Sequence, residues 1–169
     1  MIVLDDIDRR IVAALQADGR LAMVDLADKV GLSPTPCQRR VKRLEDEGVI
    51  ARYAALVSPP SVGFDLQAMV QVTLDDHSEK TVEAFEAAIR ARSEVVACYA
   101  MTGDMDFLLH VLATDLASFS EFAMKALLRM PGVRGTRSSF IMQAVKSDLA
   151  WAPQPQTNKP QAPSAKARR

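Results

Sequence analysis

The segment from Gly31 to Gly48, GLSPTPCQRRVKRLEDEG, places the strongest constraint on how this chain folds. Ser33 or Thr35 can cap the start of a helix, and the neighbouring prolines suit a first turn, where no backbone N–H is needed. Thr35 followed by Gln38 also fits a capping box, and the closing glycine suits a left-handed residue just past a helix end. We therefore predict a short, well-delimited helix over residues 35–48.

The predicted helix separates into an apolar face and a basic face. Cys37, Val41 and Leu44 follow the spacing i, i+4, i+7, which predicts one buried stripe. At about 100° per residue, the opposite side carries Thr35, Gln38, Arg39, Lys42 and Arg43. A cationic face beside a capped N-terminus suits phosphates, and Arg and Gln side chains can read guanine and adenine edges. The alternative is that this basic run is an ordinary solvated helix face.

The surrounding sequence favours DNA binding. A first helix is predicted over residues 5–18, with Asp5 as its cap and acidic side chains that suit the positive end of the helix dipole. A shorter helix over residues 25–30 and a turn at residues 30–33 complete a helix-turn-helix. Residues 49–57 have strand propensity and predict a wing. Arg52 in this segment could contact the DNA backbone or be a solvated hairpin charge. Residues 1–57 thus form a predicted winged helix-turn-helix domain.

A second domain is predicted after the stiff Ser58-Pro59-Pro60-Ser61 break, which lies in a linker over residues 58–65. Strands are predicted at 66–74, 95–101, 107–113 and 133–145, and helices at 78–91 and from Asp115 or Ser118 to just before Met130. The order β-α-β-β-α-β predicts a ferredoxin-like domain over residues 66–148, in which one sheet face is covered by helices. The other face carries apolar side chains that need a cover, which predicts a homodimer. The chain is thus α+β, with a disordered, basic, Pro-rich tail at 149–169.

Composition limits the other functional classes. The chain has 169 residues, 49% of them hydrophobic, with 21 basic and 21 acidic side chains, so any DNA affinity must come from local segregation of charge. Neither the two cysteines nor the two histidines has a metal-ligand spacing, and we predict no metal and no cofactor. The absence of a signal peptide or a long apolar run predicts a cytoplasmic protein with no membrane partner, and the predicted DNA binding associates it with the nucleoid. Asp104, Asp106 and His110 are the best candidates for catalysis, but no nucleophile–base set accompanies them, so we predict no enzyme activity.

Four segments resemble one protein family. LDDIDRRIVAALQADGR at 4–20, VGLSPTPCQRRVKRLEDEGVI at 30–50, TGDMDFLL at 102–109 and LLRMPGVRGTRS at 127–138 are similar to the Lrp/AsnC (leucine-responsive regulatory protein) family of transcription regulators. The resemblance runs from residue 4 to about 146. It implies a winged helix-turn-helix joined to an amino-acid-sensing domain, dimers that often assemble into octamers, and control of genes for amino-acid metabolism or transport. Ala22 departs from the family, in which a polar residue often caps the second helix.

The resemblance also implies specific residues. For double-stranded DNA, we predict base contacts from Gln38 and Arg39, with Arg43 as a further candidate. Phosphate contacts are predicted for Thr35, Arg40, Lys42 and Arg52. A dimer would place two recognition helices about 34 Å apart, on an imperfect palindrome. An alternative function is a nucleoid-associated architectural DNA-binding protein with little ligand dependence.

An amino-acid effector is expected at the turn between the second and third sensor strands, which comprises Gly103, Asp104, Met105 and Asp106. The last strand, at Thr136, Arg137 and Ser138, is expected to lie opposite. A glycine turn exposes N–H groups that suit an α-carboxylate, and a carboxylate can hold an α-ammonium group. The alternative is that this turn is only a tight hairpin.

Overall fold

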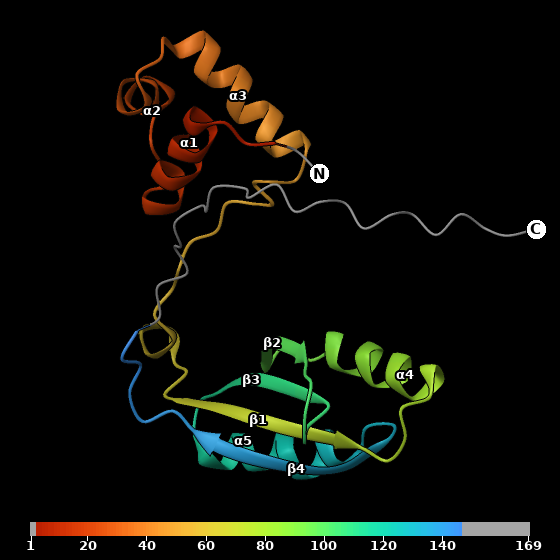
Figure 1. The fold of residues 1–169 in the computed structure, drawn as a ribbon. Coiled ribbons are helices and arrows are strands. Elements are labelled where there is room, and N and C mark those ends of the chain that lie inside the picture. Colours follow the sequence, from red (N-terminus) through yellow and green to blue (C-terminus); the bar gives the residue numbers. More distant parts are fainter. Residues whose placement is uncertain (1–2, 147–169) are drawn as a thin grey trace, which may run out of the picture. The chain divides into compact units, whose positions relative to one another are not determined.

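The computed structural model describes residues 3–146, which divide into two compact units between Ala55 and Leu56 (Figure 1). We call residues 3–55 the helical unit and residues 56–146 the sheet unit. The predicted C-terminal tail at 149–169 lies outside the described residues. No helix within residues 3–146 combines the length and apolar character needed to cross a bilayer.

The helical unit contains α1 (Asp6–Ala17), α2 (Met23–Val30) and α3 (Pro34–Asp46). Asp5 caps α1 in a capping box: its carboxylate accepts from the Asp8 N–H at 2.8 Å, and its own N–H donates to the Asp8 carboxylate at 3.2 Å. Ala22 precedes α2 without any side-chain cap, as its sequence predicts. The core of the unit is formed by Ile11, Val12, Leu26, Ala27, Val30, Cys37, Val41 and Leu44. The predicted apolar stripe of the third helix is therefore confirmed.

The start of α3 differs from the prediction. Ser33 is the N-cap residue, its side chain makes no capping hydrogen bond, and the helix begins at Pro34. The capping box predicted from Thr35 and Gln38 is wrong, because Thr35 already lies inside the helix. Pro36 occupies the third helical position, so the N–H that a cap side chain would usually bind there does not exist. At the other end, Gly48 has φ 70° and adopts the predicted left-handed conformation.

The predicted wing strand is also wrong. Residues 51–58 have no regular secondary structure, and the helical unit contains no strand within residues 3–55. A single extended segment cannot satisfy its backbone by pairing when no second strand lies beside it. The segment is instead attached to α3 through Tyr53, whose hydroxyl donates a hydrogen bond to Glu45 at 2.8 Å.

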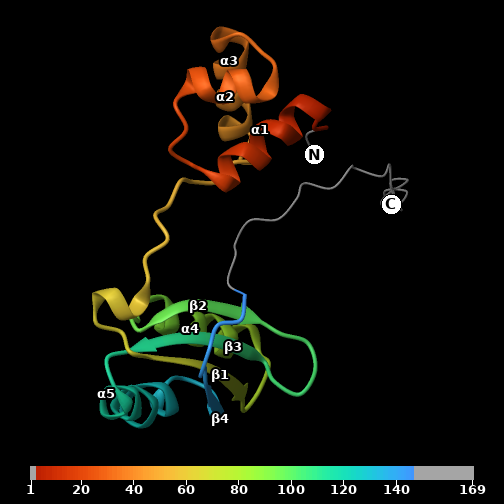
Figure 2. The same cartoon turned by 90° about the vertical axis from the view of Figure 1, so that its left-hand side faces the viewer.

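The sheet unit has the predicted order of strands and helices. After a 3₁₀ turn, η1 (Pro59–Val62), its regular elements are β1 (Leu66–Leu74), α4 (Glu79–Arg90), β2 (Val95–Ala100), β3 (Phe107–Ala113), α5 (Leu116–Glu121) and β4 (Val133–Phe140). The strands pair antiparallel in the order β2-β3-β1-β4, as Figure 2 shows. This is the predicted ferredoxin-like arrangement. β4 ends at Phe140 rather than near Val145.

The last helix is less regular than predicted. α5 is followed by a π-helical segment, η2 (Phe122–Ala126), and a 3₁₀ turn, η3 (Leu127–Arg129). The helical spacing predicts burial of Phe119, Phe122, Leu127 and Leu128. The first three are buried, but Leu128 is 37% exposed, so that part of the prediction is wrong. The change in helical pitch alters which side chains face the sheet, and a uniform period of 3.6 residues cannot anticipate it.

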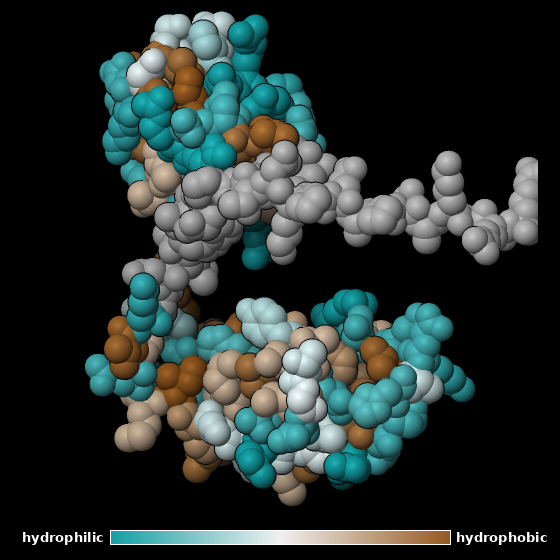
Figure 3. All heavy atoms as spheres, in the orientation of Figure 1, coloured by the Kyte–Doolittle hydropathy of each residue, from teal (hydrophilic) through white to brown (hydrophobic). Residues whose placement is uncertain are grey.

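The two faces of the sheet differ. Ala68, Val70 and Val72 of β1, with alternate residues of β3, pack beneath α4 and the α5 segment, so both helical segments cover one face (Figure 1). The other face, which we call the open face, has no covering element within the sheet unit. Its members follow from the strand register: Gln67, Met69, Gln71, Thr73, Ala97, Tyr99, Leu108, His110, Leu112, Gly135, Arg137 and Ser139. Figure 3 shows apolar side chains exposed among polar ones on the sheet unit.

Candidate DNA-binding surface and effector pocket

The basic face of α3 is exposed where the sequence predicts DNA contacts. Thr35, Gln38, Arg39 and Lys42 all reach solvent. Lys42 forms an i,i+4 ion pair with Asp46 at 3.2 Å, with its side chain 72% exposed. Among the described residues, Arg39 makes no ion pair. Arg52 lies beyond α3 in the irregular segment and is exposed.

Arg40 and Arg43 are also on α3, but both are bound by carboxylates of the first helical segment. Nη1 of Arg40 donates to Asp5 at 2.7 Å and to Asp8 at 2.8 Å. Nη2 of Arg43 donates to Asp8 at 2.5 Å. The backbone N–H of Asp8 and then the Arg40 guanidinium lower the pKa of Asp5, and the same pairing raises the pKa of Arg40. No local sequence pattern predicts this cluster, because its carboxylates and its guanidinium groups are more than thirty residues apart.

A pocket of about 280 Å³ on the sheet unit brings together residues from the two predicted effector segments. We call it the effector pocket. Its lining residues are Gln71, Thr73, Asp104, Met105, Gly135, Thr136 and Arg137. The loop between β2 and β3 thus meets β4 across the end of β1, on the open face. Of the predicted residues, Asp104, Met105, Thr136 and Arg137 lie together.

The effector pocket combines opposite charges with an apolar wall. Asp104 supplies a carboxylate and Arg137 a guanidinium, and neither makes an ion pair within the described residues. Met105 supplies an apolar surface. Gln71 and Thr73, which the sequence analysis missed as site residues, add hydrogen-bonding groups from β1. The signal for them is their polar character at alternate positions of an otherwise apolar strand.

Three predicted effector residues do not line this pocket. Gly103 is exposed with φ 106°. Asp106 accepts a hydrogen bond from the Leu74 backbone N–H at 2.7 Å and bonds to His77 at 2.6 Å. Ser138 lies opposite Val70 in the register and therefore on the helix-covered side. His110 forms a hydrogen bond with the Gln67 side chain at 3.1 Å on the open face, so its ring has a partner within the sheet.

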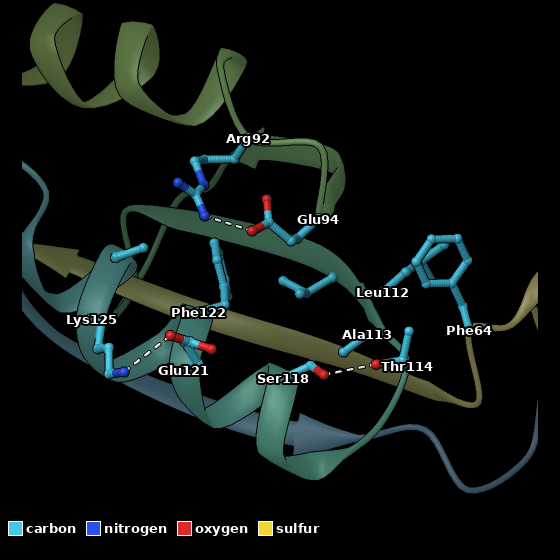
Figure 4. Close-up of a pocket in the computed structure, with 12 residues that line it drawn as sticks. Phe64, Arg92, Glu94, Leu112, Ala113, Thr114, Ser118, Glu121, Phe122 and Lys125 are labelled. Atoms are coloured by element: carbon cyan, nitrogen blue, oxygen red, sulfur yellow. Dashed lines mark hydrogen bonds and ion pairs between the residues drawn. The ribbon is translucent and has the colours of Figure 1, made fainter.

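A second pocket, of about 490 Å³, lies between the end of β3 and the α5 segment (Figure 4). Arg92 pairs with Glu94 at 2.5 Å, and Lys125 pairs with Glu121 at 3.0 Å. Arg92 also lies over the Phe122 ring, 5.6 Å from its centroid. The charged groups of this pocket are thus already matched to one another. Within residues 3–146, no group of His, Cys, Asp and Glu side chains has the arrangement of a metal site.

Comparison with known proteins assigns both units to families. Residues 67–151 match the model of the Lrp/AsnC ligand binding domain, and residues 4–51 match a winged helix-turn-helix DNA-binding model. The chain belongs to the Lrp/AsnC family. It is a DNA-binding transcriptional regulator with a ligand-binding domain, and this family consists of regulators rather than enzymes.

Similar Lrp/AsnC regulators extend over most of the chain. The leucine-responsive regulatory protein of Haemophilus influenzae is 43% identical over 143 residues, which cover 85% of this chain and 86% of that protein. The leucine-responsive regulatory protein of Escherichia coli K12 is 41% identical over 143 residues, which cover 85% of this chain and 87% of that protein. A Neisseria meningitidis transcriptional regulator, solved in complex with L-Met, superposes with TM-score 0.84 at 42% identity and covers 88% of this chain and 96% of its own.

Proposed function

We propose that this Lrp/AsnC regulator responds to an amino acid bound in the effector pocket. The observation that carries the proposal is the placement of Asp104 and Arg137 around one small pocket with Met105. A free α-amino acid carries an ammonium group and a carboxylate, which Asp104 and Arg137 complement. Charge-assisted hydrogen bonds of this kind are the stronger ones, and an Arg fork matches a carboxylate bidentately.

The second pocket is the less suitable receptor for a zwitterion. Its cations and anions already neutralise one another, so a charged ligand would have to break the Arg92–Glu94 or Lys125–Glu121 pair. The effector pocket imposes no such cost. The names of relatives agree with an apolar amino acid, since one is called leucine-responsive and another was solved with L-Met. Met105 offers a surface for such a side chain.

For DNA, we propose that α3 enters the major groove with Gln38 and Arg39 directed at base edges. Thr35, Lys42 and Arg52 would contact phosphates from the flanks. A dimer would place two α3 helices about 34 Å apart on an imperfect palindrome. The regulated genes would be those of amino-acid metabolism or transport, and the protein would act in the cytoplasm on the nucleoid.

We further propose that a second copy of the chain covers the open face. The effector pocket opens on this same face, so a bound amino acid would adjoin the interface between copies. Any ligand that binds one assembly state more tightly shifts the population toward it, which couples effector binding to DNA binding.

Thermal-shift titration against the twenty amino acids tests effector binding. A ligand at about 100 times its dissociation constant stabilises the folded state by roughly 2.7 kcal/mol, so the melting temperature of the sheet unit should rise by several degrees. Arg137→Gln should abolish the shift. Lys125→Gln, which removes a cation from the second pocket, should keep it. If no amino acid shifts the parent, or if Lys125→Gln alone removes the shift, the effector assignment is wrong.

Arg39→Ala tests the DNA-reading surface. We expect it to weaken binding to a selected operator by about 1–3 kcal/mol, and to relax the base preference at one position. Electrophoretic mobility shifts with the operator and its single-base variants measure both effects. Equal operator affinity for parent and variant would contradict the proposed base contact.

A further inference from the structure

Asp8 is an unusual residue in the helical unit. Among the described residues, Asp8 alone is a buried charged side chain, with 1% exposure, although it lies in the first turn of α1. A favourable interaction with the helix dipole does not require burial. Burial of a carboxylate is costly unless it is paired and hydrogen-bonded, so its partners should explain its position.

The Asp8 carboxylate accepts the Asp5 N–H at 3.2 Å in the capping box, and its charged partners come from α3. One carboxylate oxygen accepts from Arg40 at 2.8 Å and the other accepts from Arg43 at 2.5 Å. Arg40 additionally reaches Asp5 at 2.7 Å. Within this cluster, two carboxylates therefore face two guanidinium groups. The side chains of Arg40 and Arg43 are 29% and 43% exposed, so both remain at the surface while they are paired.

The same arginines line a hollow beside the exposed face of α3. This hollow, of about 390 Å³, is lined by Leu32, Pro36, Arg39, Arg40 and Arg43. Without partners, three guanidinium groups in one concavity would attract any phosphate, regardless of base sequence. Asp5 and Asp8 offset the charges of Arg40 and Arg43, so among the three arginines of this hollow only Arg39 makes no ion pair within the described residues.

We propose that Asp8 is a positioning residue that sets DNA-sequence specificity by holding Arg40 and Arg43 away from non-specific phosphate contacts. The inference rests on the proposed binding of DNA by α3. It separates the three arginines of α3 that were predicted to contact DNA into two groups. Arg39 acts on DNA directly. Arg40 and Arg43 are held by Asp8 and do not contact phosphates of unselected DNA.

The test compares Asp8→Asn with Asp6→Asn in the full chain. Asp6 also lies in the first turn of α1, but its side chain is 97% exposed and pairs only with Arg9 among the described residues. Both variants therefore change the net charge equally, but only Asp8→Asn removes a carboxylate that holds arginine side chains of α3. Binding is measured by fluorescence anisotropy between 50 and 300 mM salt. The probes are an unselected random-sequence duplex and a duplex that the parent enriches from a random library.

Asp8→Asn removes the carboxylate partner of Arg43, whereas Arg40 keeps its pair with Asp5, so one released arginine should add about one phosphate contact. We expect Asp8→Asn to steepen the slope of log K against log[salt] by about 0.9, which corresponds to roughly eightfold tighter binding to the random duplex at 0.1 M salt. Affinity for the enriched duplex should rise less, so the ratio of the two affinities falls. The proposal would be overturned if Asp8→Asn and Asp6→Asn gave the same slopes. It would also be overturned if Asp8→Asn bound both duplexes more weakly with the parent slope, because Asp8 would then only support the fold.

A second pair of variants keeps the test valid if Asp8→Asn does not fold. Arg43→Gln should leave the parent slope on the random duplex unchanged, since Arg43 is already held by Asp8. Arg39→Gln should reduce that slope by about 0.9, because on a duplex without its preferred base the Arg39 guanidinium contacts a phosphate instead. Equal reductions would overturn the proposal. If the parent enriches no duplex, sequence-specific regulation fails, but the slopes on the random duplex still decide the role of Asp8.

Discussion

At the scale of single residues, the turn between β2 and β3 holds two carboxylates with different surroundings. Asp104 and Asp106 are two positions apart in one turn and are both predicted to contact the effector. The structure turns Asp104 to the effector pocket and Asp106 to Leu74 and His77. Which carboxylate faces the pocket depends on how the loop returns to β1, and no local pattern specifies that. Asp8 illustrates the same limit, because its partners are distant in sequence.

Asp106 should contribute to stability only above acidic pH. The Leu74 N–H, and then His77, lower its pKa below the ordinary aspartate value of 3.8. Its stabilisation is therefore fully present above pH 3.8 and is lost as the pH falls through the lowered pKa. Asp106→Asn should reduce the free energy of unfolding by roughly 1–2 kcal/mol at pH 7. The difference from the parent should shrink toward pH 2.

Urea denaturation of both proteins at pH 7, 4 and 2 measures this dependence. Asp104→Asn provides the control, because Asp104 makes no hydrogen bond within the described residues and its variant should follow the parent profile. A pH-independent loss in Asp106→Asn would show that the carboxylate charge is not what stabilises this turn.

At the scale of elements, regular patterns gave accurate bounds. β1 and β3 have the predicted limits because their alternating apolar residues are buried under helices. Errors occur where an element depends on something other than its own pattern. The wing lacks a partner strand, the start of α3 lacks an N–H at Pro36, and α5 changes pitch at Phe122.

Gly132, in the turn that precedes β4, should not tolerate replacement by a residue with a side chain. Gly132 has φ 72°, and a Cβ there would overlap the Thr81 side chain in the first turn of α4. Gly132→Ala should therefore combine backbone strain with overpacking and cost roughly 2–4 kcal/mol. Gly63→Ala is the matched control, since Gly63 has φ 89° but open space around it. It should cost only about 1–2 kcal/mol. Urea midpoints compare the two variants, and equal losses would exclude a steric role for Thr81.

At the scale of the whole molecule, the open face was predictable as a surface that needs a cover, because apolar side chains such as Met69 and Tyr99 lie on it, away from the helices. Its exposed members include Tyr99, which is 56% exposed. We expect Tyr99→Asp to shift the protein toward monomers and to weaken binding to a palindromic operator, because a buried charge without a partner opposes association. Sedimentation velocity measures the change.

Met124→Asp is the control for this prediction. Met124 is 61% exposed in η2, on the helix-covered side of the same unit, so its substitution should leave the assembly state intact. Dissociation by both variants, or by neither, would place the interface elsewhere. The number of copies in the assembly could not be deduced from sequence, because apolar side chains on one face predict that the face is covered, not how many such faces assemble.

The proposed pocket is built from parts of unequal rigidity. Arg137 is held in β4 by its pairing with β1, whereas Met105 lies in the loop that joins β2 to β3. The group suited to the α-carboxylate that every amino acid carries thus belongs to the scaffold. Asp104, suited to the ammonium group, and Met105, suited to the side chain that distinguishes amino acids, both belong to a surface loop. A regulator made in this way can acquire a new preferred metabolite through changes in one short loop, while the sheet and the DNA-reading unit stay as they are.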